Sequence, residues 1–246
     1  MFPIKNTVPS RYPAVVTWTL IVMNCVVFLF QISLSPAGEK WFVLSFALIP
    51  ARYFAALPNG YAGNTLADYL PFLTNTFMHG SWLHLIFNMW TLWLFGPTVE
   101  DRLGHGRYLA FYLACGLCAS VAHAFFNPSS VVPALGASGA IAGVLGCFMR
   151  FFPLAWVVVV VPIIFIPLFF EVPAFLFVGL WFVINLLQGT AELLVPSAGG
   201  GVAWWAHIGG FIAGLAIGPL LLRSEQNYRA YYRDEGILGF GPTGRP

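Results

Sequence analysis

The feature that most constrains the fold of this chain is a series of long apolar runs along nearly its whole length. Of its 246 residues, 59% are hydrophobic and only 8% are charged, whereas about a quarter of a soluble domain is charged. Only helices and closed barrels satisfy their backbone hydrogen bonds within a bilayer. Barrel strands would show short segments of alternating polarity, and none is visible. The chain is therefore predicted to be an all-α, polytopic membrane protein.

Six apolar runs are predicted to cross the membrane. They are residues 13–32, 82–95, 108–126, 138–151, 173–188 and 204–222. A seventh run, 154–170, is ambiguous because it contains Pro162, Pro167 and five consecutive valines. With six spans and both termini inside, nine of the 11 Lys and Arg residues face the cytoplasm, as the positive-inside rule requires. The ambiguous run is therefore placed at the cytoplasmic interface or in an extended buried connector.

This topology divides the chain into three parts. Residues 1–12 form a cytoplasmic N-terminal tail, 13–222 the membrane domain and 223–246 a cytoplasmic C-terminal tail, in a plasma or inner membrane. The segment 33–80 mixes aromatic and polar residues, which is typical of an element lying on the bilayer surface. The segment 96–107 is predicted to be a short polar connector between the second and third spans.

Several classes of function are excluded by composition and motifs. The net charge is only +2 and no basic cluster is present, so nucleic acid is not a predicted partner. Cys115 and Cys118 have no neighbouring histidine or carboxylate, and are read as small buried hydrophobes. There is no H-E-x-x-H motif, and Asp68, Asp101 and Asp234 all fall in polar connectors. A zinc or aspartyl site within the membrane is therefore not predicted, nor is any cofactor.

Polar residues inside the predicted spans are candidates for function, because polar groups in a membrane are costly. His84 and Asn88 are four residues apart and share one face of the second span. Ser138 begins the fourth span behind Gly136, and His207 lies near the start of the sixth. All of these positions fall toward the outer side of the membrane. Residues far apart in the sequence thus converge at one depth.

Small residues accompany both Ser138 and His207 along their helices. Ala142 and Gly146 share the face of Ser138, while Gly210 and Gly214 share that of His207. Small residues four apart let helices approach closely in lipid, and a serine needs a base within about 2.6–3.2 Å to become a nucleophile.

Acyl transfer also needs donors aimed at the oxyanion. The Asn88 amide, the His84 ring and the Ser138 backbone N–H at a helix N-terminus are suitable. Taken singly, Ser138 could instead be a helix-packing residue, His207 a hydrogen-bonded core histidine and Asn88 an interhelical bond. Other polar residues of the spans are read only as interhelical hydrogen bonds: Asn24, Asn185 and Gln188.

Four segments carry a family resemblance: "HGSWLHLIFNMW", "FGPTVEDRLGHGRYLAFYL", "GASGAIAGVLG" and "AHIGGFIAGLAIG". Together, in this order over residues 71–218, they resemble the rhomboid family of intramembrane serine proteases. The resemblance implies a six-helix bundle whose Ser–His dyad is open to water from outside the membrane. It implies Ser138 as nucleophile and His207 as base. It places His84, Asn88 and the Gly136 of the G-x-S-G motif on the oxyanion side.

The sequence departs from the family pattern in two places. Some members carry an aromatic residue four positions after the nucleophile, where this chain has Ala142, so Trp204 or Trp205 is expected to hold the His207 ring instead. The family's Trp-Arg pair in the first external loop is also missing, because Phe42 follows Trp41.

The predicted activity is cleavage of single-span membrane proteins near the outer membrane face, with those substrates and membrane lipid as partners. The alternative is a non-catalytic rhomboid-like protein that binds membrane clients. Residues 196–203 are glycine-rich and are considered either a lid or a simple turn. Trp181 and Phe182 of the fifth span are considered either part of a lateral gate or lipid-facing side chains.

Overall fold

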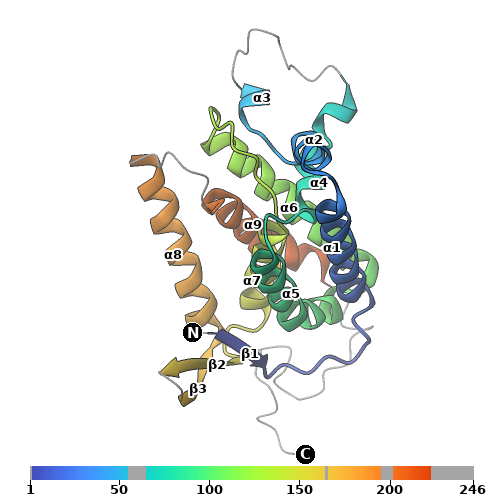
Figure 1. Ribbon diagram of the computed structural model, residues 1–246. Coiled ribbons are helices and arrows are strands. Elements are labelled where there is room, and N and C mark those ends of the chain that lie inside the picture. The colour runs from blue at the N-terminus through green and yellow to red at the C-terminus, as the bar shows by residue number, and fades with distance from the viewer. Residues whose placement is uncertain (1, 55–64, 164–165, 195–201, 223–246) are drawn as a thin grey trace, which may run out of the picture.

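The computed structural model describes residues 2–54, 65–163, 166–194 and 202–222, and helices make up most of this part of the chain (Figure 1). The helices are α1 (Val15–Ser33), α2 (Pro36–Phe46), α3 (Ala51–Phe54), α4 (Pro71–Thr74), α5 (Trp82–Leu103), α6 (His105–Phe126), α7 (Ser138–Phe151), α8 (Ala174–Leu194) and α9 (Trp204–Ile217). Short 3-10 turns occur at Leu66–Tyr69, Asn75–Phe77 and Gly218–Leu221.

Four helical segments of the described chain are long and apolar enough to cross a membrane: α1, α6, α8, and α9 with the 3-10 turn that follows it. The apolar helix α7 has only 14 residues, a length of about 21 Å against a hydrocarbon core of about 30 Å. The mostly helical membrane architecture is thus confirmed, while the number of six spans stays a prediction.

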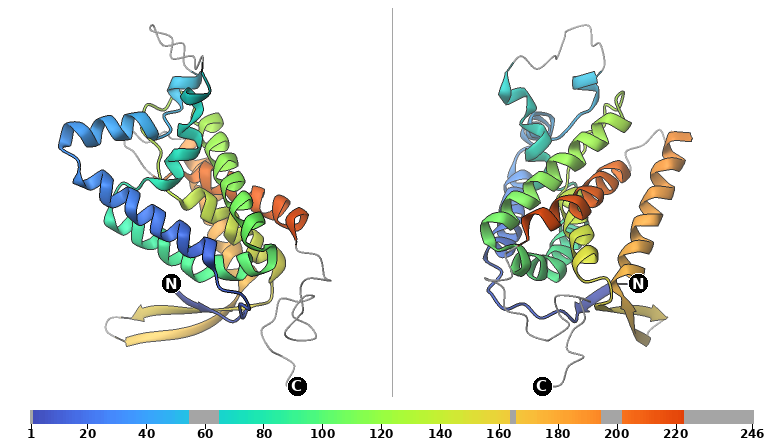
Figure 2. Two further views of the ribbon diagram at one scale, coloured as in Figure 1. Left: turned by 90° about the vertical axis from the view of Figure 1, so that its right-hand side faces the viewer. Right: turned by 180° about the vertical axis from the view of Figure 1, so that it is seen from behind.

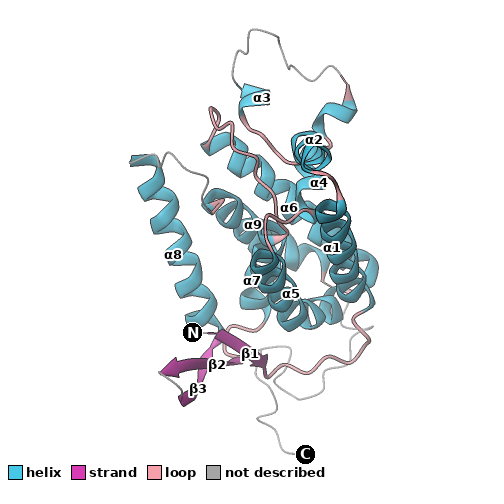
Figure 3. Ribbon diagram, in the orientation of Figure 1, coloured by secondary structure: helices cyan, strands magenta, loops and turns pink. Residues whose placement is uncertain are grey.

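The prediction of an all-α chain is wrong in one region, because a three-stranded antiparallel sheet lies at one end of the helices (Figure 3). Its strands, in the order β1-β2-β3, are β1 (Phe2–Asn6), β2 (Trp156–Ile163) and β3 (Ile166–Pro173). Strands β2 and β3 arise from the ambiguous run 154–170, which is therefore extended and not a seventh helix. Its prolines disfavour a helix and its β-branched valines favour a strand.

Strand β1 comes from the predicted N-terminal tail and is tied to α5. The indole Nε1 of Trp90 donates a hydrogen bond to the carbonyl of Pro3 at 2.7 Å, and Asn6 Nδ2 donates to the carbonyl of Leu94 at 2.6 Å. On β2, Val157 and Val159 are fully buried against the helices. The sheet therefore joins the N-terminus, α5 and the segment that leads into α8.

The prediction of a polar connector at residues 96–107 is also wrong, because α5 continues to Leu103 and α6 begins at His105. Gly96 and Pro97 are residues typical of helix ends, yet both lie inside α5. Gly104 makes the whole turn between the two helices with a φ of +80°, a conformation that favours glycine. Asp101 is consequently a buried residue of α5 and not part of a polar loop.

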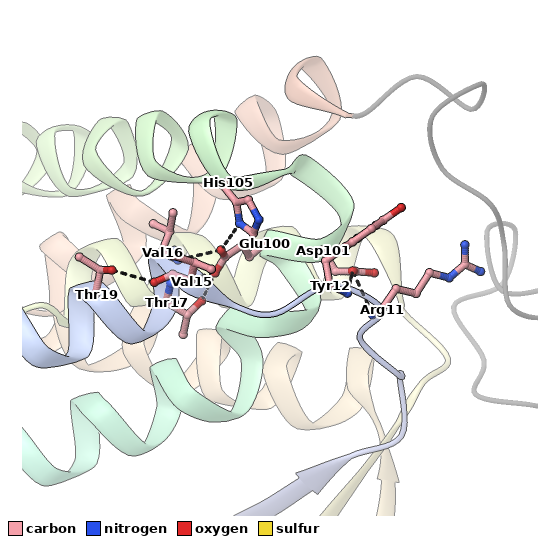
Figure 4. A network of polar contacts seen from close by, with 9 residues as sticks. All are labelled: Arg11, Tyr12, Val15, Val16, Thr17, Thr19, Glu100, Asp101 and His105. Atoms are coloured by element: carbon pink, nitrogen blue, oxygen red, sulfur yellow. Dashed lines mark hydrogen bonds and ion pairs between the residues drawn. The ribbon is translucent and has the colours of Figure 1, made fainter.

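Two carboxylates at the end of α5 bind the start of α1 (Figure 4). Glu100, 1% exposed, accepts hydrogen bonds from the backbone N–H groups of Val16 and Thr17 at 2.8 Å each, and contacts His105 Nδ1 at 2.6 Å. Asp101 accepts from two backbone N–H groups just before α1. The first N–H groups of a helix have no partner within the helix. Glu100 satisfies two of them, and the two carboxylates together fix the start of α1 against α5.

Helices α7 and α9 cross at glycines. A Cβ atom added to Gly210 or Gly214 of α9 would collide with the carbonyl oxygens of Gly139 and Gly143 of α7. Close approach of helix backbones in lipid requires such small residues. The crossing sets the first turn of α7 against the first turns of α9.

Helix α8 stands at the edge of the bundle, continuing directly from β3 (Figures 1 and 2). Its buried residues are Ala174, Val178, Asn185 and Gly189, while most of its large apolar side chains are exposed. It packs against α7 and α9, and the ring of its Phe177 is stacked with that of Phe95 in α5, with centroids 6.5 Å apart. Much of the apolar surface of α8 therefore lies outside the bundle.

Candidate functional site

Ser138 and His207, predicted as nucleophile and base, form a direct hydrogen bond in the structure. Ser138 is the first residue of α7, and its Oγ lies 2.8 Å from Nε2 of His207 in the first turns of α9. The α7–α9 glycine crossing is what brings the two helix starts this close. His207 is only 9% exposed, so its ring is held within the protein.

His84 and Asn88, predicted as oxyanion donors, lie in the same cavity as the pair. The cavity has a volume of about 750 Å³. Its wall includes Ser138, His207, His84 and Asn88, with the loop 127–135 and Glu192 of α8 on other sides. Asn88 is 7% exposed, and its Nδ2 has no hydrogen-bond partner among the described residues. A residue of the cavity wall thus carries a buried donor without a partner, which is costly unless a ligand supplies an acceptor.

Gly136 is required by two features of the site. Its φ is +133°, a conformation that residues with a Cβ rarely adopt. A Cβ at this position would lie 2.8 Å from Nε2 of His84, too close for van der Waals contact. The N–H of Gly136 donates to the carbonyl of Asn75 at 2.9 Å, so this N–H is already used in the resting structure. Gly136 therefore gives His84 room beside Ser138.

The His207 ring is held by aromatic residues other than the one that Ala142 replaces. The ring of Trp204 meets it edge-on, with centroids 6.3 Å apart, and the ring of Trp181 from α8 lies closer at 5.7 Å. Trp205 is stacked on Phe126 at 3.7 Å instead. Of the two predicted tryptophans, only Trp204 contacts His207, and Trp181 was not predicted.

The second ring nitrogen of His207 has a partner that sequence reasoning did not assign. Nδ1 of His207 lies 2.6 Å from Oδ1 of Asn185 on α8. Asn185 was read from the sequence as an interhelical hydrogen bond, which is confirmed, but its partner could not be named. The available signal was its position as a polar residue inside an apolar helix.

The two features considered for substrate access have different outcomes. Most of the glycine-rich segment 196–203 lies outside the described residues. Trp181 and Phe182, by contrast, pack inward: the ring of Phe182 is stacked on that of Phe211 in α9 at 4.4 Å, and Trp181 lies against His207. The alternative that these two side chains merely face lipid is therefore wrong.

Chemically, the site offers a serine hydroxyl hydrogen-bonded to an imidazole. The cavity beside this pair is large enough for a peptide segment, and His84 and Asn88 in its wall carry N–H donors. This arrangement suits a nucleophilic attack assisted by a general base. Among the described residues, no group of three or more His, Cys, Asp or Glu side chains is placed to bind a metal.

Comparison with known proteins identifies the family. The sequence model of the Rhomboid domain matches residues 67–224, which contain both helices of the Ser–His pair. The chain belongs to the rhomboid family.

Similar rhomboid proteins come from bacteria and eukaryotes. Rhomboid protein 1, mitochondrial, of Saccharomyces cerevisiae is 29% identical over 164 residues, covering 63% of this chain and 42% of its own. Rhomboid protease GluP of Bacillus subtilis is 44% identical over 77 residues, covering 31% and 15%. Presenilin-associated rhomboid-like protein, mitochondrial, of Homo sapiens is 34% identical over 136 residues, covering 52% and 32%. The chain spans less than half the length of these rhomboid relatives.

Proposed function

We propose that this rhomboid protein is an intramembrane serine endopeptidase. The observation that carries the proposal is the 2.8 Å hydrogen bond between Ser138 Oγ and His207 Nε2 at the wall of a cavity. One relative, from Bacillus subtilis, is named a rhomboid protease, which supports the same conclusion. A serine is unreactive until an adjacent base takes its proton, and the pair provides that base.

The proposed reaction proceeds by acyl transfer. Ser138 Oγ attacks the peptide carbonyl while His207 Nε2 takes its proton, and the carbonyl oxygen becomes an oxyanion. The unpartnered Nδ2 of Asn88 and a ring N–H of His84 donate to that oxyanion. When the C–N bond breaks, His207 returns the proton to the leaving amine. Water then hydrolyses the ester on Ser138 by the same steps and regenerates the enzyme.

The proposed substrates are single-span membrane proteins cut near the outer membrane face. A peptide bond within a helix is hidden by its own hydrogen bonds, so the substrate must unwind locally before its carbonyl reaches Ser138. The described site begins at the starts of α5, α7 and α9, which under a six-span topology all lie toward the outer side. Nine of the 11 cationic residues then lie inside with both termini, in a plasma or inner membrane.

The test uses the purified protein in detergent with a model single-span substrate. Ser138→Ala and His207→Ala are each expected to abolish cleavage, and the double variant is expected to lose little more, because the two residues act as a unit. A serine-reactive fluorophosphonate should label the wild type at Ser138 and fail to label His207→Ala. Ser33→Ala, which changes an exposed serine at the end of α1, serves as the control.

If Ser138→Ala retains more than a trace of activity, the assignment of the nucleophile is wrong. If the folded wild type neither cleaves substrates nor reacts with the fluorophosphonate, the chain is a non-catalytic rhomboid-like protein that binds membrane clients. Co-purification of an uncleaved single-span protein would then identify such a client.

A further inference from the structure

Asn185 is a buried polar residue of α8 that the proposed reaction does not use. It is 3% exposed, and its side chain makes two short hydrogen bonds. Nδ2 donates to the carbonyl of Trp181 one turn earlier at 2.7 Å, and Oδ1 lies 2.6 Å from Nδ1 of His207. Both ends of the amide are therefore satisfied inside the protein.

The first of these bonds determines which way the amide points. A carbonyl oxygen can only accept, so the group facing Trp181 must be the NH₂ of Asn185. The group facing His207 is then Oδ1, which can also only accept. A flipped amide would place Oδ1 of Asn185 against the carbonyl oxygen of Trp181, and two acceptors repel each other. Only the observed orientation of the amide is therefore possible.

The orientation of the amide in turn determines where the neutral imidazole of His207 carries its proton. Because Oδ1 only accepts, Nδ1 must be the N–H nitrogen. Nε2 is then the nitrogen with the free lone pair, and it faces Ser138 Oγ at 2.8 Å. This is the tautomer in which His207 can take a proton from the serine.

We propose that Asn185 is a positioning residue that holds His207 in the tautomer and orientation of a general base. The inference rests on the proposed function for its catalytic meaning, but the tautomer can be measured without activity. Ser138 lies on α7, His207 on α9 and Asn185 on α8. A competent base therefore requires α8 to be in its observed position, beside the other two helices.

Two substitutions and one matched control test the proposal. Asn185→Leu keeps a similar volume but removes both hydrogen bonds. Asn185→Asp keeps the acceptor toward His207, adds charge and loses the donor to the Trp181 carbonyl. The control is Asn24→Ala in α1, since Asn24 is also fully buried and donates from Nδ2 to the carbonyl of Leu20, again one turn earlier at 2.7 Å. Asn24 thus makes the same kind of hydrogen bond within its own helix as Asn185 does, but its side chain is not bonded to a histidine.

The first readout is the tautomer of His207, measured by nitrogen NMR of protein with labelled histidines. The signal of His207 is assigned by its absence in His207→Ala. The wild type is expected to show protonated Nδ1 and unprotonated Nε2 at His207, and Asn185→Leu a mixture of tautomers. The second readout is the rate of fluorophosphonate labelling at Ser138, with kcat, KM and the thermal midpoint. Losing the partner of a metal-bound histidine costs about 10- to 100-fold, and a kcat loss of that order is expected for Asn185→Leu.

The pH profile separates positioning from packing. In Asn185→Asp the carboxylate keeps the acceptor and favours the protonated ring, so activity should be partly restored relative to Asn185→Leu. As the pH is lowered, the activity of Asn185→Asp should also begin to fall at a higher pH than that of the wild type, because the protonated ring cannot act as a base. A purely structural role would lower the thermal midpoint without moving the profile.

The proposal is overturned if Asn185→Leu leaves the tautomer unchanged, or if its labelling rate per folded molecule equals that of the wild type and of Asn24→Ala. A folded wild type with the expected tautomer but no cleavage or labelling would instead overturn the proposed function and leave this inference standing.

Discussion

Replacing Asn88 by alanine should separate catalysis from stability. In the resting structure Asn88 Nδ2 has no hydrogen-bond partner among the described residues, so the substitution removes no bond of that donor. The free energy of unfolding should change by less than about 1 kcal/mol. If the donor serves the oxyanion, kcat should fall by about 10²- to 10³-fold, equivalent to about 2.7–4 kcal/mol. KM should change little, because the bond forms in the transition state.

The assay measures initial cleavage rates over a range of substrate concentrations in detergent, together with the thermal midpoint of each variant. Asn24→Ala is the matched control, because its buried amide makes a hydrogen bond within α1. It is expected to lose stability and keep kcat. Asn88→Asp adds a sharper test: it replaces a donor with a negative acceptor facing the same cavity, and should be slower than Asn88→Ala.

Two results would refute the reasoning. Parallel losses of kcat and thermal stability in Asn88→Ala would make Asn88 a structural residue. A raised KM with unchanged kcat would make it a substrate-binding residue with no preference for the transition state.

Two further predictions concern the rest of the fold. Glu100→Ala leaves the part-buried N–H of Val16 and the buried N–H of Thr17 without acceptors. The free energy of unfolding should fall by about 1–3 kcal/mol for the buried group and by less for the other. Chemical denaturation of this variant beside the exposed Glu171→Ala, which should be near neutral, checks this. Phe182→Val removes the stacking on Phe211, which is worth about 0.5–1.5 kcal/mol. If α8 is a gate, the rate of cleavage should rise by up to about fivefold for each 1 kcal/mol of packing lost. Unchanged or slower cleavage with a lowered thermal midpoint makes α8 a scaffold.

Local signals in the sequence predicted much of the helical architecture. The starts of α5, α7 and α9 at Trp82, Ser138 and Trp204 were predicted correctly, because each begins an apolar run after residues that favour turns. The approach of Ser138 and His207 followed from a general rule, that small residues four apart let helices touch. Such signals lie within a few residues of the feature that they predict.

What the sequence did not reveal depends on contacts between distant segments. Strand β1 pairs with β2 across some 150 residues of chain, as in the register of Phe2 with Val160, and nothing local marks residues 2–6 as a strand. The end of α5 was misplaced because Gly96 and Pro97 suggested a stop, whereas Glu100 gains its role only from the start of α1. Asn185 was visible as a polar residue, but its partner depends on how α8 lies against α9.

The chemistry of Asn185 also suits its place in the protein. An ionised carboxylate on α8 would stabilise the protonated His207 more strongly than an amide does, but a charge at the centre of a membrane helix costs about 2.5–3.5 kcal/mol. An amide orients the ring without that cost, since both of its ends are paired. Under both proposals, the position of α8 then determines whether His207 presents an unprotonated Nε2 to Ser138. If α8 is also the lateral gate, the same position determines whether a substrate helix can reach Ser138.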